Sequence, residues 1–260
     1  MKKITIKKIL NQKGKKPITC LSAYSRPVAE ILDKHCDIIL VGDSLGMTLY
    51  GMKSTKEVNL NTMIQHGKTV KRFAKKSLVV CDMPYKTYTS KFVALKNARQ
   101  IIYKTKCDAV KLEGGKKIID IIKYLIKKGI PVMGHIGLLP QSATSFKSKG
   151  RSDLQKKNIL EDAILLSSSG VFSIVIECVT ESLAKKITNI VNVPTIGIGA
   201  SKHCDGQILV VDDIIGLTNF KAKFVKQYSS VRKIIEKSVK SFCAEVKSRK
   251  FPSSENIYIS

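Results

Sequence analysis

Short apolar runs of strand length recur along this chain, and amphipathic segments of helix length separate them. Five of the runs end in an ionisable residue: I-I-L-V-G before Asp43, S-L-V-V-C before Asp82, D-A-V-K-L before Glu113, P-V-M-G before His135 and S-I-V-I before Glu177. Buried parallel strands have nearly continuous apolar sequences, because helices cover the sheet on the outside. The carboxyl ends of such strands hold the ligand sites of α/β folds. The pattern therefore predicts one functional site assembled from several strand ends.

The segments between these runs predict helices. Residues 59–73 carry apolar side chains at three- and four-residue spacing, which makes a single apolar stripe. We predict further helices over residues 27–34, 91–104, 117–128, 158–168 and 182–190. A first strand ending near Ala23 and two late strands over residues 195–198 and 207–211 bring the number of strands to eight. Helices that alternate with single buried strands favour parallel pairing through right-handed crossovers.

Eight strands in a chain of 260 residues match the size of one (β/α)8 barrel, the TIM-barrel architecture. We therefore predict an α/β fold with a single barrel domain over residues 1–260. Residues 5–11 are expected to form a short helix that plugs the barrel floor. An apolar stripe from Val231 to Val246 predicts a C-terminal helix that closes the barrel.

The charge of the chain raises a nucleic-acid-binding protein as an alternative. The formal net charge is +26, from 46 basic and 20 acidic residues, but only six of the basic residues are arginines. Base recognition relies on the arginine fork, and nucleic-acid surfaces gather their cations on one face. Here the lysines occur in ones and twos along the chain. We predict no nucleic-acid partner and place the lysines on solvated helix faces.

Targeting and cysteine signals are weak. No window has the apolar length of a membrane helix, and Lys7 and Lys8 interrupt any signal-peptide core, so we expect no membrane partner and a cytoplasmic protein. The seven cysteines are scattered, without a C-x-x-C pair or Cys/His ligand spacing. That spacing argues against structural zinc and against a disulfide framework.

Three acids follow neighbouring strands. Asp43, Asp82 and Glu113 come after the second, third and fourth predicted strands, so they should converge on one side of the barrel mouth. Neighbouring carboxylates repel one another unless a hard cation lies among them. Each could instead cap a helix or face solvent. The three together predict a Mg²⁺ site.

Two further residues are candidates for catalysis. Lys111 lies two residues before Glu113, so strand alternation points both side chains into the barrel. A buried lysine needs an anion, which is either a neighbouring carboxylate in an ordinary ion pair or a substrate carboxylate. Glu177 ends the sixth strand, across the barrel from the three acids, and its apolar neighbours would raise its pKa as a general base requires.

Several blocks of the sequence resemble the ketopantoate hydroxymethyltransferase family. They occur in order between residues 19 and 213: L-V-G-D-S-L-G-M (40–47), D-M-P-Y (82–85), V-K-L-E-G-G (110–115), G-H-I-G-L-L-P-Q-S (134–142), I-E-C-V (176–179) and I-G-I-G-A (196–200). The resemblance implies a magnesium-dependent barrel related to the phosphoenolpyruvate-utilising enzymes. It also implies transfer of a hydroxymethyl group from 5,10-methylenetetrahydrofolate to 3-methyl-2-oxobutanoate, in pantothenate biosynthesis. Members form large homo-oligomers, often decamers, so an assembly of that kind is expected.

The resemblance also assigns roles to residues. It makes Asp43 and Asp82 the metal ligands, with Glu113 completing the site directly or through water, and it makes Glu177 the proton acceptor. It places four residues around the keto acid: Asp43, Ser44, Asp82 and Lys111. It gives His135 no settled role, and a structural role stays open beside a hydrogen bond to the reacting groups.

Three positions depart from the family pattern. Ser25 stands where many members have an acid, Ala222 replaces a common proline, and residues 142–153 are poorer in glycine than the usual lid. These departures bear on folate affinity and rate, since none of them touches the metal or base positions. The nearest alternative is another metal-dependent 2-oxo acid lyase or mutase of the phosphoenolpyruvate-utilising superfamily. Such enzymes usually carry a cysteine-containing signature near the substrate, which this sequence lacks.

Overall fold

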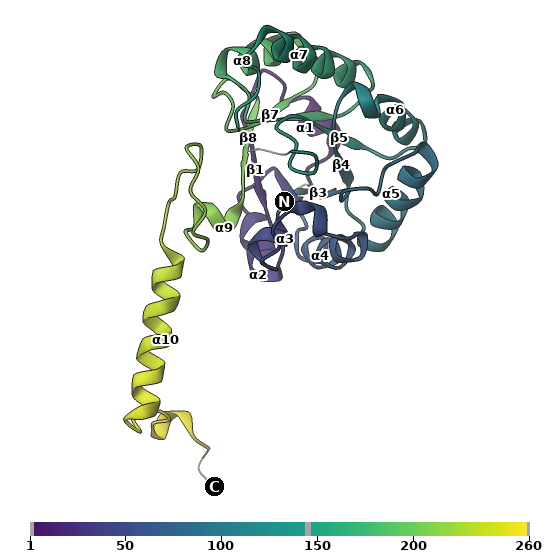
Figure 1. Cartoon of the computed structure of the whole chain (residues 1–260). Helices are drawn as coiled ribbons and strands as arrows, with labels where there is room; N and C mark the ends of the chain where they lie inside the picture. Colours follow the sequence, from purple (N-terminus) through teal and green to yellow (C-terminus); the bar gives the residue numbers. More distant parts are fainter. Residues whose placement is uncertain (1–2, 144–146, 259–260) are drawn as a thin grey trace. The chain divides into compact units, whose positions relative to one another are not determined.

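The computed structural model describes residues 3–143 and 147–258 (Figure 1). The chain separates into two compact units, Met1–Val210 and Val211–Ser260, and each is described by itself. A single domain over residues 1–260 therefore stays a prediction.

The first unit is a closed barrel of eight parallel strands in the order of the sequence. The strands are β1 (Ile18–Ser22), β2 (Ile38–Val41), β3 (Leu78–Asp82), β4 (Ala109–Glu113), β5 (Val132–Gly137), β6 (Ser173–Glu177), β7 (Thr195–Ile198) and β8 (Gly206–Leu209). β8 returns to pair with β1, and Ile18 lies opposite Gly206 in that register. The prediction of a (β/α)8 barrel is confirmed.

Helices surround the strands as an outer layer (Figure 1). They are α2 (Arg26–Leu32), α3 (Leu45–Thr48), α4 (Leu60–Phe73), α5 (Lys91–Thr105), α6 (Ile119–Lys127), α7 (Asp153–Ser168) and α8 (Glu181–Ile190), with 3-10 turns η1 (Thr55–Glu57) and η2 (Lys116–Ile118). Side-chain caps set several starts: Asn59 and Ser90 each accept a backbone N–H from the first turn of α4 and α5.

The start of α7 differs from the prediction by five residues. The helix begins at Asp153, where Ser152 caps it by accepting the N–H of Gln155 at 3.3 Å, whereas the apolar spacing placed the start at Asn158. Residues 153–158, at the start of α7, are exposed and pack no apolar stripe against the barrel. Capping chemistry, and not periodicity, marks this end of the helix.

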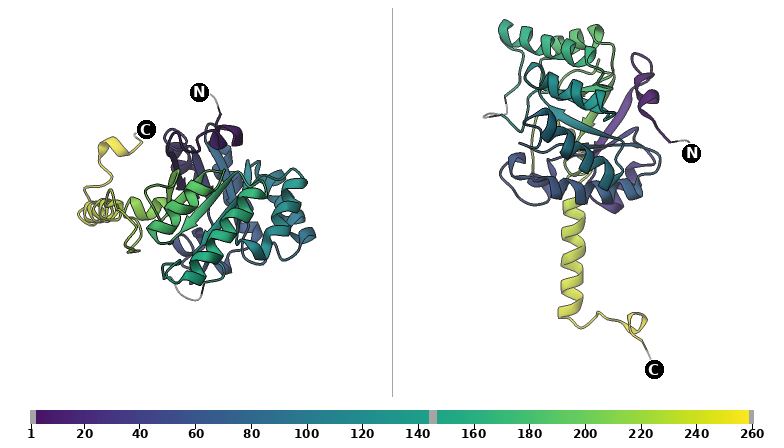
Figure 2. Two further views of the ribbon diagram at one scale, coloured as in Figure 1. Left: turned by 90° about the horizontal axis from the view of Figure 1, so that it is seen from above. Right: turned by 90° about the vertical axis from the view of Figure 1, so that its right-hand side faces the viewer.

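A short N-terminal helix, α1 (Ile6–Leu10), lies at one end of the barrel (Figure 2). Thr5 caps it by accepting the N–H of Lys8 at 3.2 Å. Ile9 is 0% exposed and belongs, with Ile4, to the core cluster that the inward side chains of the strands form. The segment expected to plug the floor of the barrel therefore does so.

The second unit begins where the eighth strand ends. The strand stops at Leu209, two residues short of the predicted end, because Val211 already starts the short helix α9 (Val211–Ile214). The unit continues with α10 (Val231–Lys247) and η3 (Ser254–Asn256), so the predicted C-terminal helix is present. That α10 closes the barrel stays a prediction. Among the residues that the structure describes, no helix has both the length and the apolarity to cross a membrane.

Candidate active site

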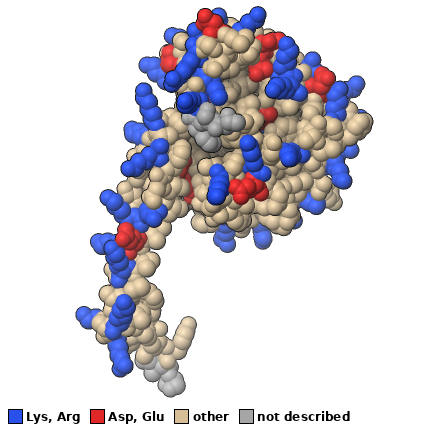
Figure 3. Space-filling model, viewed as in Figure 1, with Lys and Arg blue, Asp and Glu red and all other residues tan. Residues whose placement is uncertain are grey.

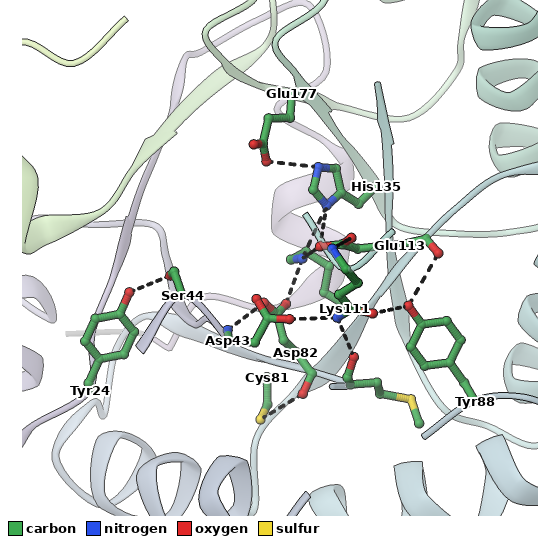
Figure 4. A network of polar contacts seen from close by, with 12 residues as sticks. Tyr24, Asp43, Ser44, Cys81, Asp82, Tyr88, Lys111, Glu113, His135 and Glu177 are labelled. Atoms are coloured by element: carbon green, nitrogen blue, oxygen red, sulfur yellow. Dashed lines mark hydrogen bonds and ion pairs between the residues drawn. The ribbon is translucent and has the colours of Figure 1, made fainter. Parts of the chain in front are cut away.

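The predicted site residues gather at the carboxyl ends of five neighbouring strands (Figure 4). Asp82 and Glu113 are the last residues of β3 and β4, and Glu177 is the last residue of β6. Asp43 follows β2, and His135 lies within β5 opposite Glu113. All but Glu177 are buried, with exposed fractions of 2–6%. Burial of this much charge requires that the groups compensate one another.

Lys111 provides positive charge at the centre of the cluster. Its Nζ lies 2.9 Å from Oδ1 of Asp82 and 3.9 Å from Oε1 of Glu113. Burial opposes the charge on the ammonium group, but Asp82, Glu113 and Asp43 together hold the pKa of Lys111 above its ordinary value. Lys111 is therefore a fixed cation in this site at neutral pH.

The carboxylates of Asp43 and Asp82 lie close together. The backbone N–H of Asp43 donates to Oδ2 of Asp82 at 3.0 Å, which fixes the turn after β2 against the end of β3. Burial, and then the charge of Asp82, raises the pKa of Asp43 well above its ordinary value. Burial also raises the pKa of Asp82, although Lys111 opposes the shift. The positive charge near these two carboxylates is therefore too small to compensate for their burial.

His135 connects two of the carboxylates. Its Nδ1 lies 3.5 Å from Oε1 of Glu113, and its Nε2 lies 3.2 Å from Oε2 of Glu177. Burial and the nearby Lys111 disfavour the imidazolium, but the contacts with both glutamates raise the pKa of His135 to about 9. Glu177, which the sequence analysis places alone across the barrel, therefore joins the cluster through His135.

Ser44 also lies at this end of the barrel. Its half-buried hydroxyl is 2.7 Å from the hydroxyl of Tyr24, a residue to which sequence reasoning gave no role. The carbonyl of Tyr24 in turn lies 2.7 Å from Nδ1 of His66. Tyr24 follows the first strand, as the predicted acids follow other strands, and this position is the signal that could have identified it.

Gln141 is the main residue that the sequence analysis missed. Its Nε2 donates to Oδ2 of Asp43 at 2.7 Å, and its backbone N–H donates to Oε2 of Glu113 at 3.0 Å. Tyr88, which was also missed, donates its hydroxyl to the side-chain carbonyl of Gln141. Gln141 lies in the segment 134–142, one of those that carry the family resemblance, and this was the signal available for it. Only the path of the loop after β5 shows that it contacts two acids.

The donor chemistry of the site fits a hard divalent cation. Asp43, Asp82, Glu113 and Glu177 face two cationic groups, Lys111 and the imidazolium of His135. Oδ1 of Asp82 is buried, and Lys111 lies 2.9 Å from it as its cationic partner. Carboxylate oxygens are the ligands that Mg²⁺ prefers. No set of three His, Cys, Asp or Glu side chains in the described ranges stands at coordinating geometry. Lys111, Gln141 and His135 link these acids in this structure.

Comparison with known proteins identifies the family. A family model described as ketopantoate hydroxymethyltransferase matches residues 3–254. A 3-methyl-2-oxobutanoate hydroxymethyltransferase of Pelagibacter ubique is 58% identical over 255 residues, which cover 97% of this chain and 99% of the relative. An enzyme of the same name from Rhizobium etli is 50% identical over 262 residues, which cover 99% of this chain and 96% of the relative.

Solved structures agree on the fold. Phosphonopyruvate hydrolase superposes with a TM-score of 0.66 at 9% identity, covering 100% of this chain and 92% of its own. A 2,3-dimethylmalate lyase of the PEP mutase/isocitrate lyase superfamily gives 0.62 at 10% identity, covering 97% and 87%. At these identities the likeness concerns the fold alone. On the family model and the curated relatives, the resemblance seen in the sequence is confirmed, and the chain belongs to the ketopantoate hydroxymethyltransferase family of enzymes.

Proposed function

We propose that this protein transfers a hydroxymethyl group from 5,10-methylenetetrahydrofolate to 3-methyl-2-oxobutanoate. The product is 2-dehydropantoate, one water molecule supplies the hydroxyl oxygen, and the reaction belongs to pantothenate biosynthesis. The observation that carries the proposal beyond family membership is the buried Lys111 among acids at the strand ends. A fixed cation beside carboxylates suits a reaction in which negative charge develops on the oxygen of a 2-oxo acid.

The metal site belongs to the proposal. Asp43 and Asp82 would hold Mg²⁺, with Glu113 beside them, and the ion would supply Lewis-acid polarisation of the keto oxygen. A solved phosphonopyruvate hydrolase with the same fold is described as a complex with oxalate and Mg²⁺; its TM-score is 0.64 at 9% identity. Oxalate, like the proposed substrate, carries a carboxylate beside a second carbonyl carbon.

The remaining steps use side chains of this chain. Glu177 takes the proton from C3 of the 2-oxo acid, while Lys111 stabilises the negative charge on the keto oxygen. Nε2 of His135 holds the carboxylate of Glu177 in place from 3.2 Å. The hydroxyl of Ser44, oriented by Tyr24 at 2.7 Å, is available to the substrate carboxylate. The C3 carbon then bonds to the methylene carbon of the folate as one C–N bond of that carbon breaks, and the released nitrogen takes up a proton. Water replaces the second nitrogen at the same carbon, which supplies the hydroxyl group and releases tetrahydrofolate.

Isotope exchange tests the base and the metal together. Wild-type protein with Mg²⁺ should exchange the C3 proton of 3-methyl-2-oxobutanoate in D₂O, and chelation should stop the exchange until Mg²⁺ is restored. Glu177→Gln should lower the exchange rate by about 10²-fold or more, the range of general-base catalysis. Glu181→Gln is the matched control, since its side chain is 58% exposed at the start of α8. Full exchange in Glu177→Gln would disprove the base assignment.

Two outcomes separate this function from the lyase or mutase alternative. With 5,10-methylenetetrahydrofolate present, the wild-type protein should convert the 2-oxo acid into 2-dehydropantoate. Exchange without that product would instead favour another reaction of the same fold. We further expect a homo-oligomer, which the family resemblance suggests is a decamer, and light scattering of the purified protein measures that oligomeric state. We expect the protein in the cytoplasm.

A further inference from the structure

A basic pocket lies at the amino-terminal ends of β3 and β4. It has a volume of about 400 Å³ and lies where α4 and α5 end, so residues from three separate segments of the chain line it. Its exposed cationic side chains include Lys68, Arg72, Lys75, Lys104 and Lys106. The proposed active site occupies the opposite, carboxyl-terminal ends of the same strands. The pocket is therefore a separate site.

The charges of the pocket are unbalanced. Seven basic residues line it, and Lys3 and Lys71 are among them. Both pair with the adjacent Asp108, Lys3 at 2.7 Å, and Asp108 also accepts the N–H of Val79 at 2.9 Å. Since Asp108 is already shared in this way, six formal positive charges remain in excess. A concave surface focuses such a field and attracts anions.

Lys71 is the most buried cation of the pocket for which a pKa shift is resolved. Burial, and then the charge of Lys3, lowers the pKa of Lys71, although Asp108 opposes the shift. An anion in the pocket would favour the charged form of Lys71 and screen it from Lys3. The spacing of lysines along the sequence did not reveal this concentration, because the segments meet only in the folded barrel. Figure 3 shows, on the face that it draws, Lys and Arg spread over many helices without forming one stripe.

We propose that this pocket binds a small molecule that carries two or more adjacent phosphate groups. Lysine ammonium groups bind phosphate as point charges, and the guanidinium of Arg72 can form two parallel bonds to one phosphate. The volume lies within the range of small-molecule pockets, which is about 300–1,000 Å³. A nucleoside diphosphate or inorganic pyrophosphate has this chemistry. A nucleic acid needs a longer track of cations than one pocket offers.

Calorimetric titration of the full-length protein tests the proposal. Pyrophosphate and ADP should bind at least about tenfold more tightly than AMP and than citrate, an anion of similar charge without phosphate. ADP tighter than pyrophosphate would identify a nucleotide as the ligand, and equal affinities would identify the diphosphate itself; both outcomes support the pocket. Affinity should fall steeply with salt.

Variants place the binding in the pocket. The triple variant Lys68→Gln, Lys75→Gln, Lys104→Gln should weaken pyrophosphate binding at least about tenfold. A matched triple variant at the end of α6, Lys123→Gln, Lys127→Gln and Lys128→Gln, removes the same charge from exposed positions on the helix and at its C-cap. It should change affinity less than about twofold. Both variants should keep the hydroxymethyl-transfer activity and the melting temperature of the wild type, which shows that they fold.

Three results would overturn the proposal. The first is equal pyrophosphate affinity in the two triple variants. The second is binding of citrate as tight as that of pyrophosphate, which would show that the pocket binds anions without selecting phosphate. The third is a single-stranded RNA that binds more tightly than ADP and loses its affinity in the pocket variant, which would make this surface a nucleic-acid site.

Discussion

Replacement of Ile9 by alanine tests how much the floor of the barrel depends on α1. Ile9 is 0% exposed and packs in the same cluster as inward residues of the strands. The substitution removes three carbon atoms, which corresponds to a transfer free energy of about 2.4 kcal/mol at about 0.8 kcal/mol for each methylene. The cavity left behind adds to that loss, so we expect the free energy of unfolding to fall by about 3–4 kcal/mol.

Urea unfolding and melting curves measure this loss. For a chain of this size each kcal/mol lowers the melting temperature by about 2–4 °C, so a decrease of about 6–16 °C is expected. Ile31→Ala is the matched control, because Ile31 is 58% exposed on α2 and should cost no more than about 0.5 kcal/mol. Equal effects of the two substitutions would refute the reasoning, since α1 would then contribute no buried contact to the barrel.

Three further substitutions follow from single contacts. Gly137→Ala should lower kcat at least about tenfold, because at φ +95° a Cβ would lie 2.3 Å from the backbone oxygen of Glu177, the proposed base. Gly129→Ala is its control: this glycine also has a positive φ, but a Cβ there would meet open space, so kcat should not change. Gln141→Glu should lower kcat/KM at least about tenfold in a steady-state assay, since it replaces an amide donor beside a buried carboxylate with a like charge. Asp33→Asn should cost about 1–2 kcal/mol at pH 7 in urea unfolding, because the carboxylate accepts three backbone N–H groups from residues 75–77.

The pH dependence gives the third substitution its own check. Burial opposes ionisation of Asp33, but the backbone hydrogen bonds lower its pKa below the ordinary value. A lowered folded pKa stabilises the protein fully above the unfolded value of about 3.9, and this contribution disappears as the pH falls through the folded value. Wild type and Asp33→Asn should therefore converge in stability in acid; a constant difference down to pH 2 would contradict the assignment. An unchanged kcat in Gly137→Ala would contradict the first of these three predictions. An unchanged kcat/KM in Gln141→Glu would contradict the second.

The sequence predicted those features that local patterns encode. Eight apolar runs between amphipathic segments specify a barrel, because each strand must be covered on the outside and packed on the inside. The same runs predict the candidate site, since Asp82 and Glu113 end their strands and the barrel brings those ends together. Strand alternation also predicted that Lys111 faces inward, and it lies 2.9 Å from Asp82.

The features that depend on the path of a loop could not be predicted in this way. Gln141 reaches Asp43 across 98 residues of sequence, and no period in the chain encodes such a contact. The link from Glu113 through His135 to Glu177 likewise depends on side-chain rotamers at three neighbouring strands. The proposal of a keto acid and a folate as substrates rests on family resemblance, because residue chemistry alone points to a cation and a proton acceptor.

The plugged floor of the barrel has a consequence for the order of events in catalysis. Since Ile4 and Ile9 fill one end, substrates reach the buried carboxylates only from the other end. In the proposed reaction the small 2-oxo acid would then lie deepest, and a folate bound above it would block its entry and exit. For the proposed reaction, a site with one open end predicts an ordered kinetic mechanism. The keto acid binds before the folate, and tetrahydrofolate leaves before 2-dehydropantoate.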